Sequence, residues 1–142
     1  MIGPAMTPEI LARITAARAQ RDLSDLARQA VGTTAADTTP AERIRAARRL
    51  RQMAHEIVDL VVLAEALSGA PWEEITDALS RRDPRTVEGE YSDAVADWKA
   101  MTEDDMTAAA VGSEGLDSWY ARHREDHDPD ARNAVSDLVN RH

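Results

Sequence analysis

Cysteine and phenylalanine are absent from this chain of 142 residues, and the aromatic residues are limited to three Trp and two Tyr. The lack of Cys excludes disulfides, thiolate metal sites and cysteine nucleophiles. Gly and Pro number only six each, whereas Ala and Leu are abundant. Because Ala and Leu are strong helix formers, the composition predicts an all-α fold, a helical bundle with a modest core. A homodimer is one way to supplement such a core.

Long apolar runs are missing as well. The most apolar stretch, residues 57–67, contains Asp59 and Glu65, and it is shorter than the ~20 apolar residues of a membrane span. Residues 1–8 lack the basic segment followed by an apolar stretch that is typical of a secretory signal. We therefore expect a cytoplasmic protein that makes no contact with a membrane.

The net charge of −9 is unevenly distributed along the chain. Residues 1–70 contain nine Arg against eight Asp and Glu, whereas residues 71–142 contain eight Lys and Arg against eighteen Asp and Glu. The acidic half predicts a well-solvated surface that repels nucleic acid or contacts a basic partner. We divide the chain into a helical domain, residues 1–112, and a charged helical C-terminal tail, residues 113–142.

Helix-start signals predict two long helices in the first half, over residues 8–31 and 40–68. Thr7 and Thr39 can each cap a helix, and each precedes a Pro at the first helical position. Glu42 completes a capping box with Thr39. The second helix is the longer of the two, and we expect it to form the spine of the domain.

The spine helix has apolar residues at three- and four-residue steps, which predicts one buried stripe. The stripe consists of Ile44, Ala47, Leu50, Ala54, Ile57, Val61, Ala64 and Leu67. In the first helix, the predicted inward residues are Ile10, Leu11, Ile14, Leu23, Leu26, Ala27 and Ala30.

Weaker signals predict the rest of the secondary structure. A capping box that begins at Thr102 predicts a short acidic helix ending near Gly112. Residues 112–115 have the composition of a loop, and an amphipathic stretch follows over residues 116–123. Asp128-Pro129 predicts the start of a last short helix.

The segment from Gly69 to Trp98 carries the main functional signal. The spine helix ends at Gly69, a short helix follows with Trp72, Ile75 and Leu79 on one face, and Asp83-Pro84 starts a new helix. This order of elements is typical of a helix-turn-helix, in which the first short helix braces the second.

The segment resembles the helix-turn-helix domains of small bacterial regulators, over about residues 69–98. In those domains a small residue and a Trp lead into a helix with the pattern Glu-Ile-x-x-Ala-Leu, which corresponds here to Glu74–Leu79. The resemblance implies DNA binding and transcription regulation by a second helix over residues 84–101.

The segment departs from this pattern in its charge. The turn, residues 80–84, is longer and more charged than is usual in the family. The second helix offers Arg85 and Thr86 near its start but then has four carboxylates, namely Glu88, Glu90, Asp93 and Asp97. Because DNA is densely negative, these carboxylates would have to point away from the groove.

Positive charge is concentrated at two places, the start of the spine helix and the predicted turn. Residues 43–51 contain five Arg, and residues 81–85 contain three. If the fold brings them together, they form a phosphate-binding patch; otherwise they balance the acidic half through ion pairs. The candidate DNA-binding residues are Arg81, Arg82, Arg85 and Thr86, with Arg43, Arg48 and Arg49 on phosphates.

Other chemistry has little support. His123 and His127 are four residues apart near several Asp, but the spacing does not fit a zinc-protease motif. There is no nucleophile elbow and no phosphate loop. We expect neither an enzyme nor a bound cofactor or metal. Two functions stay open: a DNA-binding regulator, and an acidic protein-interaction module, an adaptor or antagonist of a regulator, that keeps the fold without DNA contact.

Overall fold

The computed structural model describes residues 6–35 and 37–140, and within them all regular structure is helical. The predicted all-α fold is therefore confirmed. The helices are α1 (Pro8–Gly32), α2 (Pro40–Leu67), α3 (Trp72–Ala78), α4 (Pro84–Lys99), α5 (Glu103–Ala109), α6 (Ser113–His123) and α7 (Ser136–Asn140). None of them is long and apolar enough to cross a membrane.

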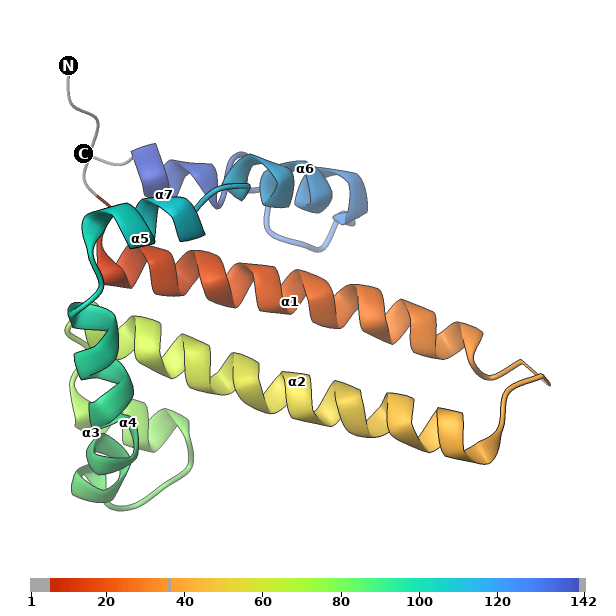
Figure 1. Cartoon of the computed structure of the whole chain (residues 1–142), viewed down its shortest axis with the longest axis horizontal. Helices are drawn as coiled ribbons and strands as arrows, with labels where there is room; N and C mark the ends of the chain where they lie inside the picture. The colour runs from red at the N-terminus through yellow and green to blue at the C-terminus, as the bar shows by residue number, and fades with distance from the viewer. Residues whose placement is uncertain (1–5, 36, 141–142) are drawn as a thin grey trace.

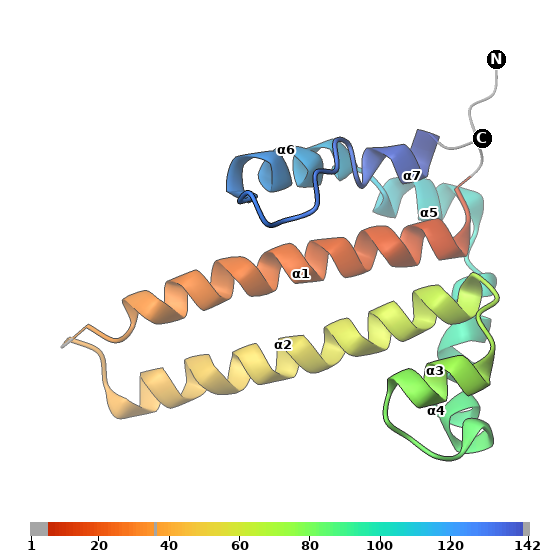
Figure 2. The ribbon, with the colours of Figure 1, turned by 180° about the vertical axis from the view of Figure 1, so that it is seen from behind.

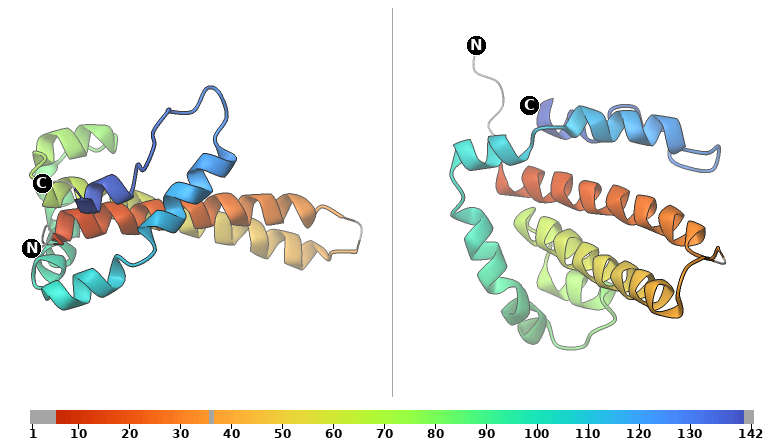
Figure 3. Two further views of the ribbon diagram at one scale, coloured as in Figure 1. Left: turned by 90° about the horizontal axis from the view of Figure 1, so that it is seen from above. Right: turned by 45° about the vertical axis from the view of Figure 1, so that its right-hand side comes forward.

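The two long helices form an antiparallel hairpin that organises the molecule (Figure 1). Helices α3 and α4 lie beyond α2, and α5, α6 and α7 lie on the opposite side of α1, as the view from behind also shows (Figure 2). Helices α3, α4, α5 and α7 therefore gather toward the base of the hairpin, where α1 begins and α2 ends, whereas α6 lies along the middle of α1 (Figure 2). The tip, at residues 32–40, extends past them (Figure 1; Figure 3, left).

The predicted caps form as the sequence indicates. Thr7 accepts a hydrogen bond from the backbone N–H of Ile10, at 3.3 Å. Thr39 and Glu42 make the full capping box, with bonds of 3.1 and 3.2 Å. Thr102 likewise caps α5 by accepting from the N–H of Asp105. Since each cap satisfies N–H groups that a helix end leaves open, these residues fix where the helices begin.

Two small apolar clusters form the core, one on each side of the hairpin base. The first joins α1 to α5 and α6 and consists of Met6, Leu11, Ile14, Met106, Ala110 and Leu116. The second joins α2 to α3 and α4 through Val62, Ile75 and Val87. Among the described residues, every buried side chain lies within residues 6–16 or 62–116. The distal part of the hairpin has no fully buried residue.

The predicted buried stripe of α2 is wrong in half of its members. Ile44 and Val61 are 61% and 37% exposed, and Ala47 and Ala54 are exposed as well. The half-buried and buried residues follow a different line, namely Ala46, Leu50, Met53, Ile57, Leu60, Ala64 and Leu67. The helix carries two apolar lines about a third of a turn apart, and α1 covers only one of them. Ala27, predicted to face inward on α1, is also exposed.

Two predictions about the tail are also wrong. Residues 113–115 form the first turn of α6 rather than a loop, because Gly112, at φ +98°, ends the preceding turn and lets the new helix start at once. No helix starts at Asp128-Pro129; instead, the Asp128 carboxylate accepts from the N–H of Glu125 and closes a turn. The last helix, α7, begins only at Ser136.

Candidate functional site

The end of α2, with α3 and α4, forms a compact three-helix unit at the predicted site. Gly69 ends α2 in the left-handed region, at φ +94°, where glycine has no Cβ penalty. Ser80 also has positive φ, +57°, and begins the turn that follows α3. Asp83 then caps α4 by accepting from the N–H of Arg85 at 3.0 Å. These local signals place α3 and α4 where the sequence predicted them.

The predicted inner faces of the unit meet in its small core. Val87 is fully buried against Ile75 and Val62, and Trp72, Leu79 and Tyr91 pack around them. The rings of Trp72 and Tyr91 stack with centroids 6.4 Å apart. This packing holds α3 and α4 together against the end of α2.

Tyr91 also ties α4 to the spine helix. Its hydroxyl donates a hydrogen bond of 2.8 Å to the carboxylate of Asp59. Burial of the ring, followed by this bond to an anionic acceptor, raises the pKa of Tyr91 to about 12. The phenol therefore stays protonated across the physiological pH range and keeps donating to Asp59.

Two of the predicted DNA-binding residues at the turn are engaged within the unit. The Arg81 guanidinium makes a bidentate ion pair with Glu90, at 2.8 and 3.2 Å. This hydrogen bond lowers the pKa of Glu90 and raises that of Arg81. The Thr86 hydroxyl donates to Asp83 at 2.8 Å and lowers the pKa of that carboxyl. Both side chains are thus engaged within the unit, although both residues stay exposed.

The outer surface of the unit is acidic. Between Gly69 and Met101 there are eight carboxylates, all exposed, against four exposed basic side chains. The outward positions of α4 include Arg85, Glu88, Ser92 and Asp93. Glu88 lies near Arg85 and Ser92, on the side of α4 that the resemblance assigns to base contacts, and Asp93 lies about 140° round the helix from Glu88. A duplex approaching this face would meet more negative than positive charge.

The second predicted group, the arginines of α2, is exposed but lies elsewhere. Arg45, Arg48, Arg49 and Arg51 line an open hollow of about 760 Å³ on the first half of α2. Arg43 donates to the carbonyl of Thr38 at 2.7 Å. Within the described residues, none of the five forms an ion pair.

The two arginine groups are not brought together. Helices α3 and α4 contact α2 from Asp59 onward. Ten residues separate Arg49 from Asp59, which is about 15 Å along the helix axis. The arginines of α2 therefore lie on its first half, whereas the arginines of the turn lie near its C-terminal end. The carboxylates of α4 lie close to the second group only.

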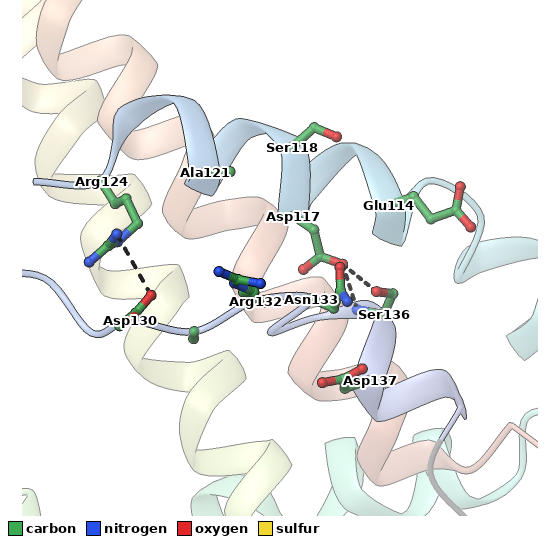
Figure 4. A pocket seen from close by; sticks show the side chains of 11 residues that line it. Glu114, Asp117, Ser118, Ala121, Arg124, Asp130, Arg132, Asn133, Ser136 and Asp137 are labelled. Atoms are coloured by element: carbon green, nitrogen blue, oxygen red, sulfur yellow. Dashed lines mark hydrogen bonds and ion pairs between the residues drawn. The ribbon is translucent and has the colours of Figure 1, made fainter.

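A second hollow lies in the tail, between α6 and the chain that returns toward α7 (Figure 4). It has a volume of about 690 Å³ and is lined by charged residues of both signs. Asp117 at its floor accepts from the N–H groups of Val135 and Ser136, at 2.7 and 3.0 Å, and from the Ser136 hydroxyl. Arg124 pairs with Asp130 at 3.7 Å.

Asp117 is a structural residue that the sequence analysis missed. Its burial raises the pKa, but the bonds from Ser136 and Val135 outweigh this effect and leave the pKa lowered. The carboxylate thereby holds the start of α7, nineteen residues away. No local spacing rule connects these positions, so the sequence carries no signal for the contact. The ion pair between Arg81 and Glu90, nine residues apart, likewise follows no local spacing rule.

His123 and His127 each make contacts with neighbouring residues of the tail. The ring of His123 stacks on Trp119, with centroids 5.0 Å apart, and its Nδ1 lies 2.7 Å from the Trp119 carbonyl. His127 is exposed and lies near Glu125 and Asp128. In residues 6–35 and 37–140, no group of three or more His, Asp or Glu could hold a metal ion.

Comparison with known proteins does not assign the chain to a family. No protein-family model matches it, and no curated protein or solved structure is significantly similar to it.

Proposed function

We propose that this chain is a cytoplasmic protein-interaction module, which uses a helix-turn-helix-shaped unit to bind a basic protein rather than DNA. The observation that carries the proposal is the charge of the unit's surface. Its eight exposed carboxylates outnumber its four basic side chains, and one of those four, Arg81, is neutralised by Glu90. An acidic surface attracts a basic partner and repels the phosphate backbone.

The shape of the unit supports a binding role for α4. The helix is held from behind by Val87 and Tyr91, so its outer positions are presented on a supported surface. Glu88 and Asp93 are both exposed on α4, five residues and about 140° of helical rotation apart, so they flank this surface. A basic patch or a helix with Lys and Arg on one face fits this arrangement of charge.

The test is affinity capture from the source cell with the whole chain as bait. We expect Glu88→Lys with Asp93→Lys to abolish capture of partners that the wild type retains. A matched variant, Asp37→Lys with Asp126→Lys, changes the net charge equally at exposed positions outside α3 and α4, and it should retain them. Equal capture by the wild type and both variants would contradict the proposal.

DNA binding is the second candidate, and the free arginines of α2 favour it. Five exposed Arg within nine residues form a positive surface without carboxylate partners in the described chain. In this alternative, Arg43, Arg48 and Arg49 contact phosphates while Arg82 and Arg85 at the turn approach a second stretch of duplex. Arg81 and Thr86 would first have to leave Glu90 and Asp83.

A salt titration separates the two candidates. Fluorescence anisotropy with random-sequence duplex DNA should show no binding at low salt if the interaction module is correct. Measurable binding that weakens with salt, and that weakens further in the Arg81→Ala, Arg82→Ala double variant, would favour the DNA-binding regulator instead.

A further inference from the structure

A second apolar line of α2 is left uncovered by all the described helices. It consists of Ile44, Ala47, Arg51, Ala54, Val58 and Val61, all of them exposed. The steps between these residues alternate between three and four, so they stay on one side of the helix along its length. Ile44 is 61% and Val58 46% exposed. Apart from Arg51, every member of the line is apolar.

A matching line on α1 lies on the same face of the hairpin. Gln20, Ser24, Ala27 and Val31 are exposed and have the same spacing, and Val31 is 71% exposed. Continued toward the base, the α1 line reaches Arg13 and the α2 line reaches Glu65. These two residues form an ion pair of 3.4 Å. Since their ends touch, the two lines run side by side and form one face.

The charges along α2 determine which orientation a second helix could adopt on this face. Residues 40–51 contain five Arg and one Glu, whereas residues 52–67 contain two Glu and one Asp. Two copies of α2 packed in parallel would place the arginines opposite each other. Packed antiparallel, the basic half of each copy faces the acidic half of the other, and Arg48 lies near Asp59 of the second copy.

The spacing of the line also suits an antiparallel copy. Its steps of three, four, three, four and three are the same in both directions. Ile44 of one copy therefore lies opposite Val61 of the other, Ala47 opposite Val58, and Arg51 opposite Ala54. Each large side chain meets a smaller one, which is the condition for interdigitated packing between helices.

We infer that this face is the dimer interface of the protein, with α2 of one copy packed antiparallel on α2 of a second copy about a two-fold axis near residues 52 and 53. The interface is isologous, because each copy contributes the same face. It lies on a different side of α2 from the one that α3 and α4 contact through Asp59 and Val62, so a dimer presents two such units at opposite ends of the paired spine helices.

The absence of cysteine allows a cross-linking test that reads out both register and orientation. The double variant Ala47→Cys, Val58→Cys should form disulfide-linked dimers on mild oxidation, because each new thiol faces its counterpart on the second copy. The two cysteines cannot pair within one chain, since eleven residues of helix place them about 16 Å apart. Each single variant should stay largely uncross-linked.

Sedimentation equilibrium of the whole chain supplies the thermodynamic test. We expect the wild type to dimerise and Val58→Lys to raise the dissociation constant at least about tenfold, because the charge is placed within the apolar line. Val111→Lys is the matched control, since Val111 is 74% exposed and lies outside this face; it should dimerise as the wild type does.

Three results would overturn the inference. They are a wild type that stays monomeric at every concentration reached, a dimer that Val58→Lys leaves intact, and efficient cross-linking of Ala47→Cys alone, which would require parallel helices or another antiparallel register. Circular dichroism of each variant shows whether the fold is retained, so a failure to fold is not mistaken for a failure to associate.

Discussion

The base and the tip of the α1–α2 hairpin are built from the same two helices but differ in how they are covered. At the base, α1 is packed against α5 and α6, and α2 against α3 and α4, so Leu11, Ile14 and Val62 are buried. Toward the tip, each helix has only the other as a neighbour (Figure 1; Figure 3). Between residues 17 and 61 no described side chain is fully buried.

The residues that stabilise the fold are therefore not the ones that are exposed for binding. Burial of apolar area is the main stabilising contribution to folding, so most of the stabilisation comes from the base. Apolar residues such as Val31, Ile44 and Val58 stay exposed, and no described helix covers them. The hairpin is therefore anchored at its base and leaves an apolar line exposed along α2.

The largest effect is expected when an apolar residue at the base and one in the distal half are each replaced by Ala. Ile14→Ala at the base should lower the free energy of unfolding by about 3 kcal/mol, since it leaves a cavity in a fully buried site. Leu26→Ala in the distal half should cost about 1 kcal/mol, because Leu26 is only half-buried. Urea unfolding followed by helical ellipticity measures both. Equal losses would remove the distinction between base and tip.

An intermediate effect concerns the tail that covers the base. Asp117→Asn should lower the free energy of unfolding by about 1–2 kcal/mol at neutral pH, because it weakens the bonds that hold the start of α7. The pKa of Asp117 is lowered in the folded state. Its stabilisation is therefore complete above the ordinary Asp pKa of about 3.9 and disappears as the pH falls through the lowered value.

Acid titration of stability provides the check on this assignment. The Asn variant should have a shallower loss of stability below about pH 4 than the wild type. Asp126→Asn, at an exposed position nearby, serves as the control and should follow the wild type. Identical acid limbs for all three proteins would show that Asp117 does not stabilise the base.

The smallest expected effect compares the two helix caps. Thr7 caps α1 next to the core at the base, whereas Thr39 caps α2 at the exposed tip. Thr7→Ala should lower the global free energy of unfolding by about 1 kcal/mol. Thr39→Ala should instead raise hydrogen exchange in the first turns of α2, with a smaller global change, because this end can open locally. A larger global loss for Thr39→Ala than for Thr7→Ala would indicate that the base, and not the tip, is the less stable end.

The sequence predicted the local parts of the fold well. Thr7, Thr39 and Thr102 cap the helices they were expected to cap, and Gly69 and Asp83 delimit α3 and α4. These signals act over three or four residues, so they can be recognised without knowledge of the fold. The inner face of the candidate site was predicted for the same reason, from the spacing of Trp72, Ile75 and Leu79.

The contacts between distant residues could not be predicted. Whether Arg81 is available to a ligand depends on Glu90, and whether the tail returns to α6 depends on Asp117. Both contacts depend on where the chain turns between the two partners. These turns include Ser80 and Asn133, which have positive φ although they are not glycine. Such positions are uncommon, so composition does not identify them.

The acidic half, the absence of Cys and the two long helices were determined by the sequence itself, because charge, chemistry and helix propensity are properties of residues and their near neighbours. Only the tertiary structure decided which of two apolar lines on α2 is buried. Both lines have helical spacing and similar residues, and the choice depends on where α1 packs. That choice leaves Ile44, Val58 and Val61 exposed.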